Sequence, residues 1–149
     1  MISDAIFAPS SGSAPSGVAI IRISGPKARA VLESFSGLIC PKPRIVMRAS
    51  MFDPKTGDAL DEGLVIWFPG PASFTGEDVV ELHIHGGRAT IEVVCRSLSD
   101  FDGCRLADPG EFSRRAFDND KLDLTEIEGL ADLIAAETEG QRKQALKQL

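Results

Sequence analysis

Residues 78–85, with the sequence DVVELHIH, place one carboxylate and two imidazoles at alternate positions. Successive side chains of a β-strand point to opposite faces, so Glu81, His83 and His85 share one face and the apolar residues between them share the other. The apolar face belongs in a core. The polar face is either left in water or used in a pocket, where its groups could form hydrogen bonds or bind a metal ion.

A second polar residue, Arg22, interrupts the apolar segment VAIIRIS at residues 18–24. Burying an unpaired guanidinium is costly, so this side chain must reach solvent, a partner acid or a ligand. From spacing alone, the ordinary explanations are favoured: Arg22 extends to the surface, or it pairs with an acid such as Glu81.

A metal site is an alternative use of Glu81, His83 and His85, because imidazoles two residues apart on a strand face the same way and zinc accepts such ligands. The chain has only two histidines, and none of its three cysteines lies near them in the sequence. The metal site is therefore less favoured. The cysteines form no metal or redox motif, and we expect reduced, buried thiols in a cytosolic protein.

Alternating strand and helix patterns provide the frame that must position these residues. Runs of β-branched residues between Gly, Pro and Asp predict strands, and apolar residues at spacings of three and four predict helices. The predicted strands cover residues 4–8, 18–24, 44–52, 63–68, 78–85 and 104–107. The predicted helices follow Gly25-Pro26 and cover residues 88–98 and 111–117. This order favours an α+β fold in which a mixed β-sheet is layered with helices.

The stretch at residues 109–134 combines several signals. Pro109-Gly110 breaks the chain, residues 118–120 form a turn, and Thr125-x-x-Glu128 matches a capping box. From Thr125 to Leu149, apolar residues recur at helical spacings, which predicts one long amphipathic C-terminal helix. The pattern contains no stop signal, so we expect the sequence to be a fragment of a longer protein.

The charge of the chain limits its partners. A net charge of −6 over 149 residues argues against unaided binding to a nucleic-acid backbone, which needs clustered cations. Arg105, Arg114, Arg115 and Lys121 could still form a basic patch, although a solvated face is the commoner outcome for scattered cations. No segment approaches the roughly 20 apolar residues of a membrane span, and no signal peptide is apparent.

Three motifs, in order, carry a family resemblance: IIRISGP, SFTGEDVVELHIHGG and PGEFSRRAFDNDKLDLTEIEGLADLI. They resemble the N-terminal region of the tRNA modification GTPases of the MnmE (TrmE) family, from about residue 4 to residue 149. The resemblance implies that residues 1–120 form a tetrahydrofolate-binding and dimerisation domain, similar to the folate-binding domain of glycine-cleavage aminomethyltransferases. Residues 121–149 would then begin the family's helical domain, with the GTPase domain outside this chain.

The resemblance also implies cofactors and partners. The family binds a one-carbon tetrahydrofolate, 5,10-methylenetetrahydrofolate, for which 5-formyltetrahydrofolate is the usual stable stand-in. It binds GTP with magnesium and potassium in the GTPase domain. Together with the flavin-dependent protein MnmG, it modifies the 5-position of the wobble uridine of certain tRNAs in the cytoplasm. This chain contains no GxxxxGK[ST] motif, so we expect neither GTP hydrolysis nor complete catalysis from it alone.

Matched residue by residue, Arg22, Glu81 and Lys121 correspond to the folate contacts of the family. Glu81 could accept two hydrogen bonds from the ring N–H and amino group of a pterin. Arg22 and Lys121 offer cations for the pterin carbonyl or the glutamate tail. Which cation meets which end of the ligand stays open, and no catalytic residue is predicted.

Two other functions remain as alternatives. One is a folate-dependent aminomethyltransferase, although such enzymes are much longer and the motifs fit them less well. The other is a pure dimerisation module with a vestigial pocket. The loop at residues 9–17, PSSGSAPSG, also departs from the family, whose first loop often has paired prolines followed by Gly and a basic residue.

Overall fold

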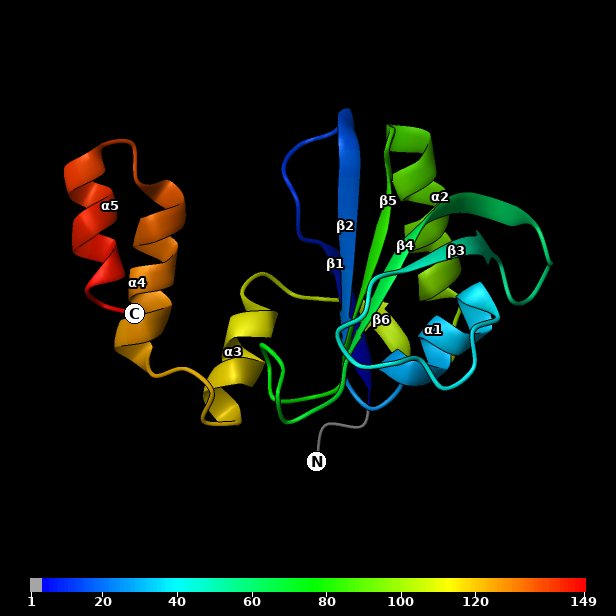
Figure 1. The fold of residues 1–149 in the computed structure, drawn as a ribbon, viewed down its shortest axis with the longest axis horizontal. Helices are drawn as coiled ribbons and strands as arrows, with labels where there is room; N and C mark the ends of the chain where they lie inside the picture. Colours follow the sequence, from blue (N-terminus) through cyan, green and yellow to red (C-terminus); the bar gives the residue numbers. More distant parts are fainter. Residues whose placement is uncertain (1–3) are drawn as a thin grey trace.

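A six-stranded sheet organises the computed structural model, which describes residues 4–149 (Figure 1). The strands are β1 (Ala5–Pro9), β2 (Ser16–Ser24), β3 (Met47–Phe52), β4 (Ala59–Phe68), β5 (Val79–Gly86) and β6 (Cys104–Leu106). The helices are α1 (Ala28–Ser36), α2 (Arg88–Ser99), α3 (Glu111–Asp118), α4 (Leu124–Ala135) and α5 (Glu139–Leu146). The predicted α+β class is confirmed.

The strand order is β3-β4-β5-β2-β1-β6, which places β2 and β5 side by side in the middle of the sheet. All neighbouring strands are antiparallel except β1 and β6, which are parallel, so the sheet is mixed as predicted. The largest difference between a predicted and an observed strand start is in β4, which begins at Ala59 rather than at residue 63. Its early residues pair with β3, opposite Met51 and Phe52.

One face of the sheet holds the hydrophobic core, covered by α1 and α2 (Figure 1). Alternate residues of the central strands point into it, and the predicted apolar side of β5 is fully buried. The core residues that β2 and β5 contribute are Ala19, Ile21, Ile23, Val80, Leu82 and Ile84. Burying such a row removes apolar surface from water, at about 25 cal/mol per Å², and so fixes which side chains face the opposite way.

The second face of the sheet is only partly covered. Helix α3 and the β4–β5 loop (residues 69–78) pack near one end of it, beside Ser24 and Arg22. Toward the other end, apolar side chains stay in contact with solvent, and Val18 and Leu64 are both exposed. A half-covered face with polar residues at its centre is where a ligand site can form.

The C-terminal region corrects the prediction of one long helix. The structure has two helices, α4 and α5, which pack against each other as a hairpin that stands apart from the sheet (Figure 1). The break has a local cause. Thr138 Oγ1 accepts from the Gln141 amide, and Gln141 Oε1 accepts from the Thr138 amide, so the two residues form a capping box that starts a new helix.

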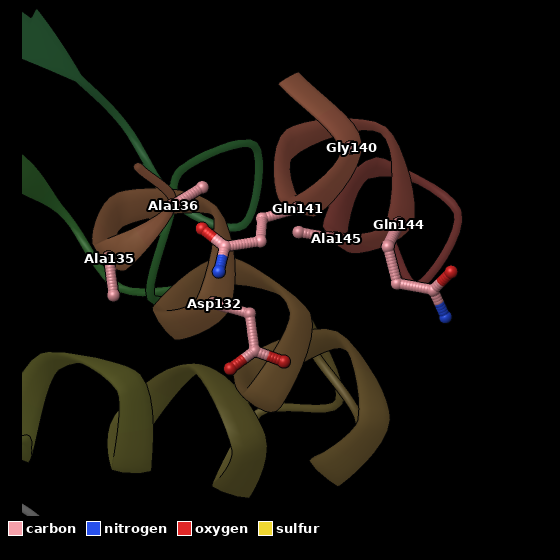
Figure 2. A pocket seen from close by; sticks show the side chains of 7 residues that line it. All are labelled: Asp132, Ala135, Ala136, Gly140, Gln141, Gln144 and Ala145. Carbon is pink, nitrogen blue, oxygen red and sulfur yellow. The ribbon is translucent and has the colours of Figure 1, made fainter. Parts of the chain in front are cut away.

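The first capping box is also shifted. Thr125 was predicted as the N-cap of this region, but the N-cap of α4 is Asp123, whose carboxylate accepts from the Glu126 amide at 2.7 Å. The same spacing of three residues occurs at both positions, and Asp is among the residues preferred at an N-cap. Between α4 and α5 lies a hollow of about 440 Å³, lined by Asp132, Ala135, Ala136, Gly140, Gln141, Gln144 and Ala145 (Figure 2).

Candidate functional site

Arg22 and Glu81 lie directly opposite each other on the neighbouring strands β2 and β5. Their side chains point to the half-covered face, and Arg22 Nη2 lies 3.5 Å from Glu81 Oε2. Both side chains are mostly but not fully buried, with 27% of Arg22 and 18% of Glu81 exposed. The predicted pairing of these two residues is therefore present, although its long distance makes it a weak contact.

Two phenylalanine rings hold the Arg22 guanidinium. Its central carbon lies 5.3 Å from the centroid of Phe74, in the β4–β5 loop, and 5.8 Å from the centroid of Phe112, in α3. Such cation–π contacts restrain the plane of the guanidinium without using its N–H donors. The Nε of Arg22 is buried and has no hydrogen-bond partner among the described residues. Arg22 is thus positioned while part of its bonding capacity stays unused.

His83 completes the local cluster, because its Nε2 lies 3.0 Å from Glu81 Oε1. The imidazole is largely buried, with 21% exposed. Its cross-strand neighbours on the same face are apolar, Ile20 on β2 and Leu64 on β4. Each oxygen of the Glu81 carboxylate therefore contacts one protein donor.

Arg115 anchors α3 to the sheet close to this site. Only 2% of its side chain is exposed, and its guanidinium contacts the carboxylates of Asp4 at 3.0 Å, Glu77 at 3.2 Å and Glu111 at 3.3 Å. Arg105 also contacts Asp4, and it holds Glu111 at 2.6 Å. The expectation that Arg105 and Arg115 lie on a solvated face is wrong for Arg115, because three acids surround it.

The charges of this network shift the titration of its members. Hydrogen bonds from the Arg105 guanidinium lower the pKa of Glu111 to about 2. Hydrogen bonds from Arg105 and Arg115 also lower the pKa of Asp4, although its burial acts in the opposite direction. The paired acids in turn raise the pKa of Arg105. These shifts favour the charged forms of Asp4, Glu111 and Arg105, whose ion pairs stabilise the position of α3.

The β4–β5 loop is fixed against β2 by hydroxyl groups. Ser24 Oγ lies 2.7 Å from Thr75 Oγ1 and donates to Glu77 Oε1 at 2.8 Å, and both Ser24 and Thr75 are fully buried. Glu77 also binds Arg115, so the loop and α3 are joined to the sheet through one carboxylate. This arrangement sets the place of Phe74, which precedes Thr75 in the same loop.

Lys121, the third predicted contact, packs against Gly76 of this loop. A Cβ added to Gly76 would come within 3.1 Å of Lys121 Cγ and 2.9 Å of Asn119 Cβ, so the bare glycine lets the lysine stem lie against the loop. Gly76 also has φ +81°, which favours glycine. The Lys121 amide donates to the Ala116 carbonyl at 2.8 Å, and its side chain is exposed.

The structure thus brings Arg22 and Glu81 into contact and places Lys121 beside the loop that carries Phe74. Within residues 4–149, no ion pair joins Lys121 to Glu81. Its ammonium group, on a flexible four-carbon stem, is free to reach a ligand that extends over the loop. Arg22 and Glu81 therefore contact each other, whereas Lys121 contacts the β4–β5 loop.

His85 behaves differently from its neighbour His83. Its Nδ1 lies 2.9 Å from Asp61 Oδ1, and its backbone amide donates to Asp61 Oδ2 at 2.8 Å. Burial raises the pKa of Asp61, but the hydrogen bonds from His85 and from the Glu62 amide outweigh it, and the net pKa is lowered. Because the two histidines bind different acids, they do not converge. The described part of the chain contains no group of three potential metal ligands, so the alternative of a metal site gains no support.

Sequence reasoning missed the residues that position the site. Phe74, Phe112, Glu77 and Arg115 were not named as members of it. A signal was available in α3, where Phe112 and Arg115 are three residues apart and therefore lie on one helix face. The partner acids Asp4 and Glu77 are far away in the sequence, and no local pattern connects them with Arg115.

None of the described helices is long and apolar enough to cross a membrane. Around Arg22, the structure combines a carboxylate that has unoccupied acceptor positions with a guanidinium that contacts two aromatic rings, and such groups can bind a flat, polar ligand.

Comparison with known proteins identifies the family. The model of the family described as "GTP-binding protein TrmE N-terminus" matches residues 5–121. The chain is 58% identical over 146 residues to a tRNA modification GTPase MnmE from Parvibaculum lavamentivorans, covering 98% of this chain and 33% of that relative. It is 57% identical to the proteins of the same name from Beijerinckia indica and Brucella anthropi, again over 98% of this chain and 32% and 33% of the relatives.

The chain therefore spans about a third of the length of these curated relatives. The family match covers more than half of the chain and includes the whole sheet, the β4–β5 loop and α3. The half-covered face with Arg22 and Glu81 is thus part of the matched region, and the chain belongs to the TrmE N-terminal family of tRNA modification GTPases.

Proposed function

We propose that this chain binds a one-carbon tetrahydrofolate on the half-covered face of its sheet, as part of a tRNA modification GTPase. The observation that carries the proposal is the Arg22–Glu81 pair, which is held in place but only weakly satisfied. A 3.5 Å contact and a buried, unpartnered Nε leave hydrogen-bonding capacity that a ligand can use. The donor set fits a reduced folate, which has an aminopyrimidinone edge, a carbonyl and an anionic tail.

In this proposal, Glu81 accepts from the ring N–H and the amino group of the pterin, because a carboxylate matches two parallel donors. Arg22, restrained by Phe74 and Phe112, offers donors to the pterin carbonyl. Lys121, beyond the β4–β5 loop, then reaches the glutamate tail. The bound folate supplies a one-carbon unit, and the residues of this chain bind and orient it.

The rest of the activity belongs to a longer protein. We propose that residues 1–120 form the folate-binding and dimerisation domain and that residues 121–149 begin a helical domain. The longer protein would bind GTP with magnesium and potassium in a separate domain. With MnmG, it would use 5,10-methylenetetrahydrofolate to modify the 5-position of the wobble uridine of tRNA in the cytoplasm. The printed names of the relatives support the GTPase and the tRNA modification.

A homodimer is supported by the apolar part of the same sheet face. Val18 is 52% exposed and Leu64 41% exposed, and Ile20 and Ile66 beside them are partly exposed. Exposed apolar rows on a sheet mark interaction surfaces, and a second copy would cover them. We expect Leu64→Glu to convert a dimer into a monomer in analytical ultracentrifugation. Ile134→Glu, which changes an exposed residue of α4, should leave the dimer intact; a monomeric wild-type chain would contradict the proposal.

Isothermal titration with 5-formyltetrahydrofolate tests folate binding directly. We expect saturable binding by the wild-type chain and a loss of affinity of about thirtyfold or more for both Arg22→Ala and Glu81→Gln, because each removes a charged partner from a partly buried site. Glu81→Gln keeps the shape of the side chain, so its effect isolates the charge and the acceptor.

The matched control is another cross-strand pair, Arg48 on β3 and Glu62 on β4, which lie 3.3 Å apart with both side chains largely exposed. Arg48→Ala and Glu62→Gln should bind folate as the wild type does. Folate binding that is absent from the folded wild-type chain, or equal in all four variants, would reject the proposed site.

A further inference from the structure

His83 stands out among the groups that the proposed function does not use. It is one of two histidines on the polar side of β5, and the two differ in exposure and in the acid that they contact. His83 is largely buried and contacts Glu81, whereas the side chain of His85 is 72% exposed and contacts Asp61. A buried polar side chain that contacts a candidate ligand-binding carboxylate calls for a functional explanation.

The contacts of the Glu81 carboxylate show what His83 does there. An ionised carboxylate has about four acceptor positions, two on each oxygen. His83 Nε2 uses one position on Oε1 at 3.0 Å, and Arg22 Nη2 uses one on Oε2 at 3.5 Å. One position on each oxygen therefore remains, which is the pattern that a ligand with two adjacent N–H groups requires.

The hydrogen bond to Glu81 also determines which ring nitrogen of His83 carries the hydrogen. A carboxylate oxygen only accepts, so the Nε2 of His83 must carry the hydrogen. The cross-strand neighbours Ile20 and Leu64 are apolar, which strengthens a hydrogen bond that would be weaker in water. Without this donor, the Glu81 carboxylate would be held only by the long contact to Arg22 and could rotate.

We propose that His83 is a positioning residue, which holds the Glu81 carboxylate in the orientation needed to bind a ligand edge with two parallel N–H donors. This inference rests on the proposed folate site and adds a residue that acts through Glu81 without contacting the ligand. It gives His83 and His85 different roles, although they are two residues apart on the same face.

Folate titration of His83 variants provides the first test. His83→Leu removes the donor and should weaken binding of 5-formyltetrahydrofolate by about tenfold or more, the value of a hydrogen bond to a charged group. His83→Gln retains an N–H donor and should stay within about threefold of the wild type. His85→Gln is the control and should bind as the wild type does. Equal affinity of His83→Leu and wild type would overturn the proposal.

A double-mutant cycle separates positioning from a general effect on the fold. In the Glu81→Gln background, His83→Leu should change the affinity by no more than about twofold, because the carboxylate on which it acts is gone. Full additivity of the two substitutions would mean that His83 acts independently of Glu81, which contradicts the proposal.

Nitrogen-15 NMR of the ligand-free chain tests the same contact without folate. Above the pH range in which histidines ordinarily titrate, His83 should carry its hydrogen on Nε2 and His85 on Nδ1. If the wild type binds no folate but shows these tautomers, the proposed function fails while the positioning of Glu81 stands. A hydrogen on Nδ1 of His83 overturns the inference whatever the folate result.

Discussion

Arg115 and Arg22 lie on the same side of the sheet, yet they are used in opposite ways. Arg115 is almost fully buried and contacts three carboxylates at 3.0–3.3 Å. Arg22 is more exposed, contacts one carboxylate at 3.5 Å and is restrained mainly by two aromatic rings. The difference suggests how to tell a structural arginine from a ligand-binding one. Arg115 is paired with carboxylates of its own chain. Arg22 is held by aromatic rings, which leave its N–H groups available to a ligand.

The two arginines are also connected through the elements that carry their partners. Helix α3 supplies both Arg115 and Phe112, and the β4–β5 loop supplies both Glu77 and Phe74. Because Arg115 binds Glu77, the ion network brings the two elements together and sets the distance between the rings around Arg22. The structural arginine thus determines the environment of the ligand-binding one.

The largest expected effect is on stability. Arg115→Met leaves Glu77 buried beside other acids without its cation, which should lower the free energy of unfolding by about 3 kcal/mol. For a chain of this size, that corresponds to a decrease of roughly 6–12 °C in Tm, measured by circular dichroism. The matched control is Arg114→Met, because Arg114 is the preceding, exposed residue of α3. Equal Tm values for the two variants would remove the contrast between Arg22 and Arg115.

Acid should weaken the same network. The pKa of Glu111 in the folded chain is about 2, below its ordinary value of 4.5, so the unfolded chain binds more protons between these values. The stabilisation from Glu111 is therefore complete above about pH 4.5 and is lost as the pH falls toward 2. Tm measured over this range should fall steeply for the wild type.

The variant that checks this assignment is Glu111→Gln, which should start from a lower Tm at neutral pH and show a shallower decrease between pH 4.5 and 2. Glu92→Gln, at an exposed position of α2, should keep the slope of the wild type. A slope unchanged by Glu111→Gln would assign the acid sensitivity to other carboxylates.

The smallest expected effect is that of Arg22→Met on the ligand-free chain. Arg22 makes one long ion pair and is partly exposed, so its removal should change the free energy of unfolding by less than about 1 kcal/mol, even though it should impair folate binding. Urea titration of Arg22→Met beside Arg115→Met measures both values under one condition. A loss at Arg22 as large as the loss at Arg115 would show that Arg22, too, is chiefly structural.

Much of the sheet was predictable because its signals are local. The alternation in residues 78–85 and the β-branched run at residues 18–24 identified β5, β2 and the face that each residue occupies. The prediction that Arg22 pairs with Glu81 depended on one condition, that β2 and β5 are neighbours in the sheet. Such predictions succeed because burial of one face determines the direction of every side chain in a strand.

Tertiary contacts explain what the sequence could not show. Arg115 looked like a surface cation because Asp4 and Glu77, which bury it, are 111 and 38 residues away in the sequence. The helical hairpin was missed for a different reason. The predicted stripe passes from Ala135 to Thr138 and then to Ala145, and the capping box of Thr138 and Gln141, which starts a new helix in this interval, was not considered.

The short connection after α3 has a mechanical consequence. The side-chain amide of Asn119 donates to the carbonyls of Thr75 and Arg115. The backbone amide of Lys121 donates to the carbonyl of Ala116. Two residues later, Asp123 is the N-cap of α4. The Leu122 amide also donates to the Ala116 carbonyl, at 3.4 Å, so the segment bound to α3 ends directly before Asp123. A rotation of the hairpin relative to the sheet would therefore occur between Leu122 and Asp123, two residues from the candidate folate contact Lys121.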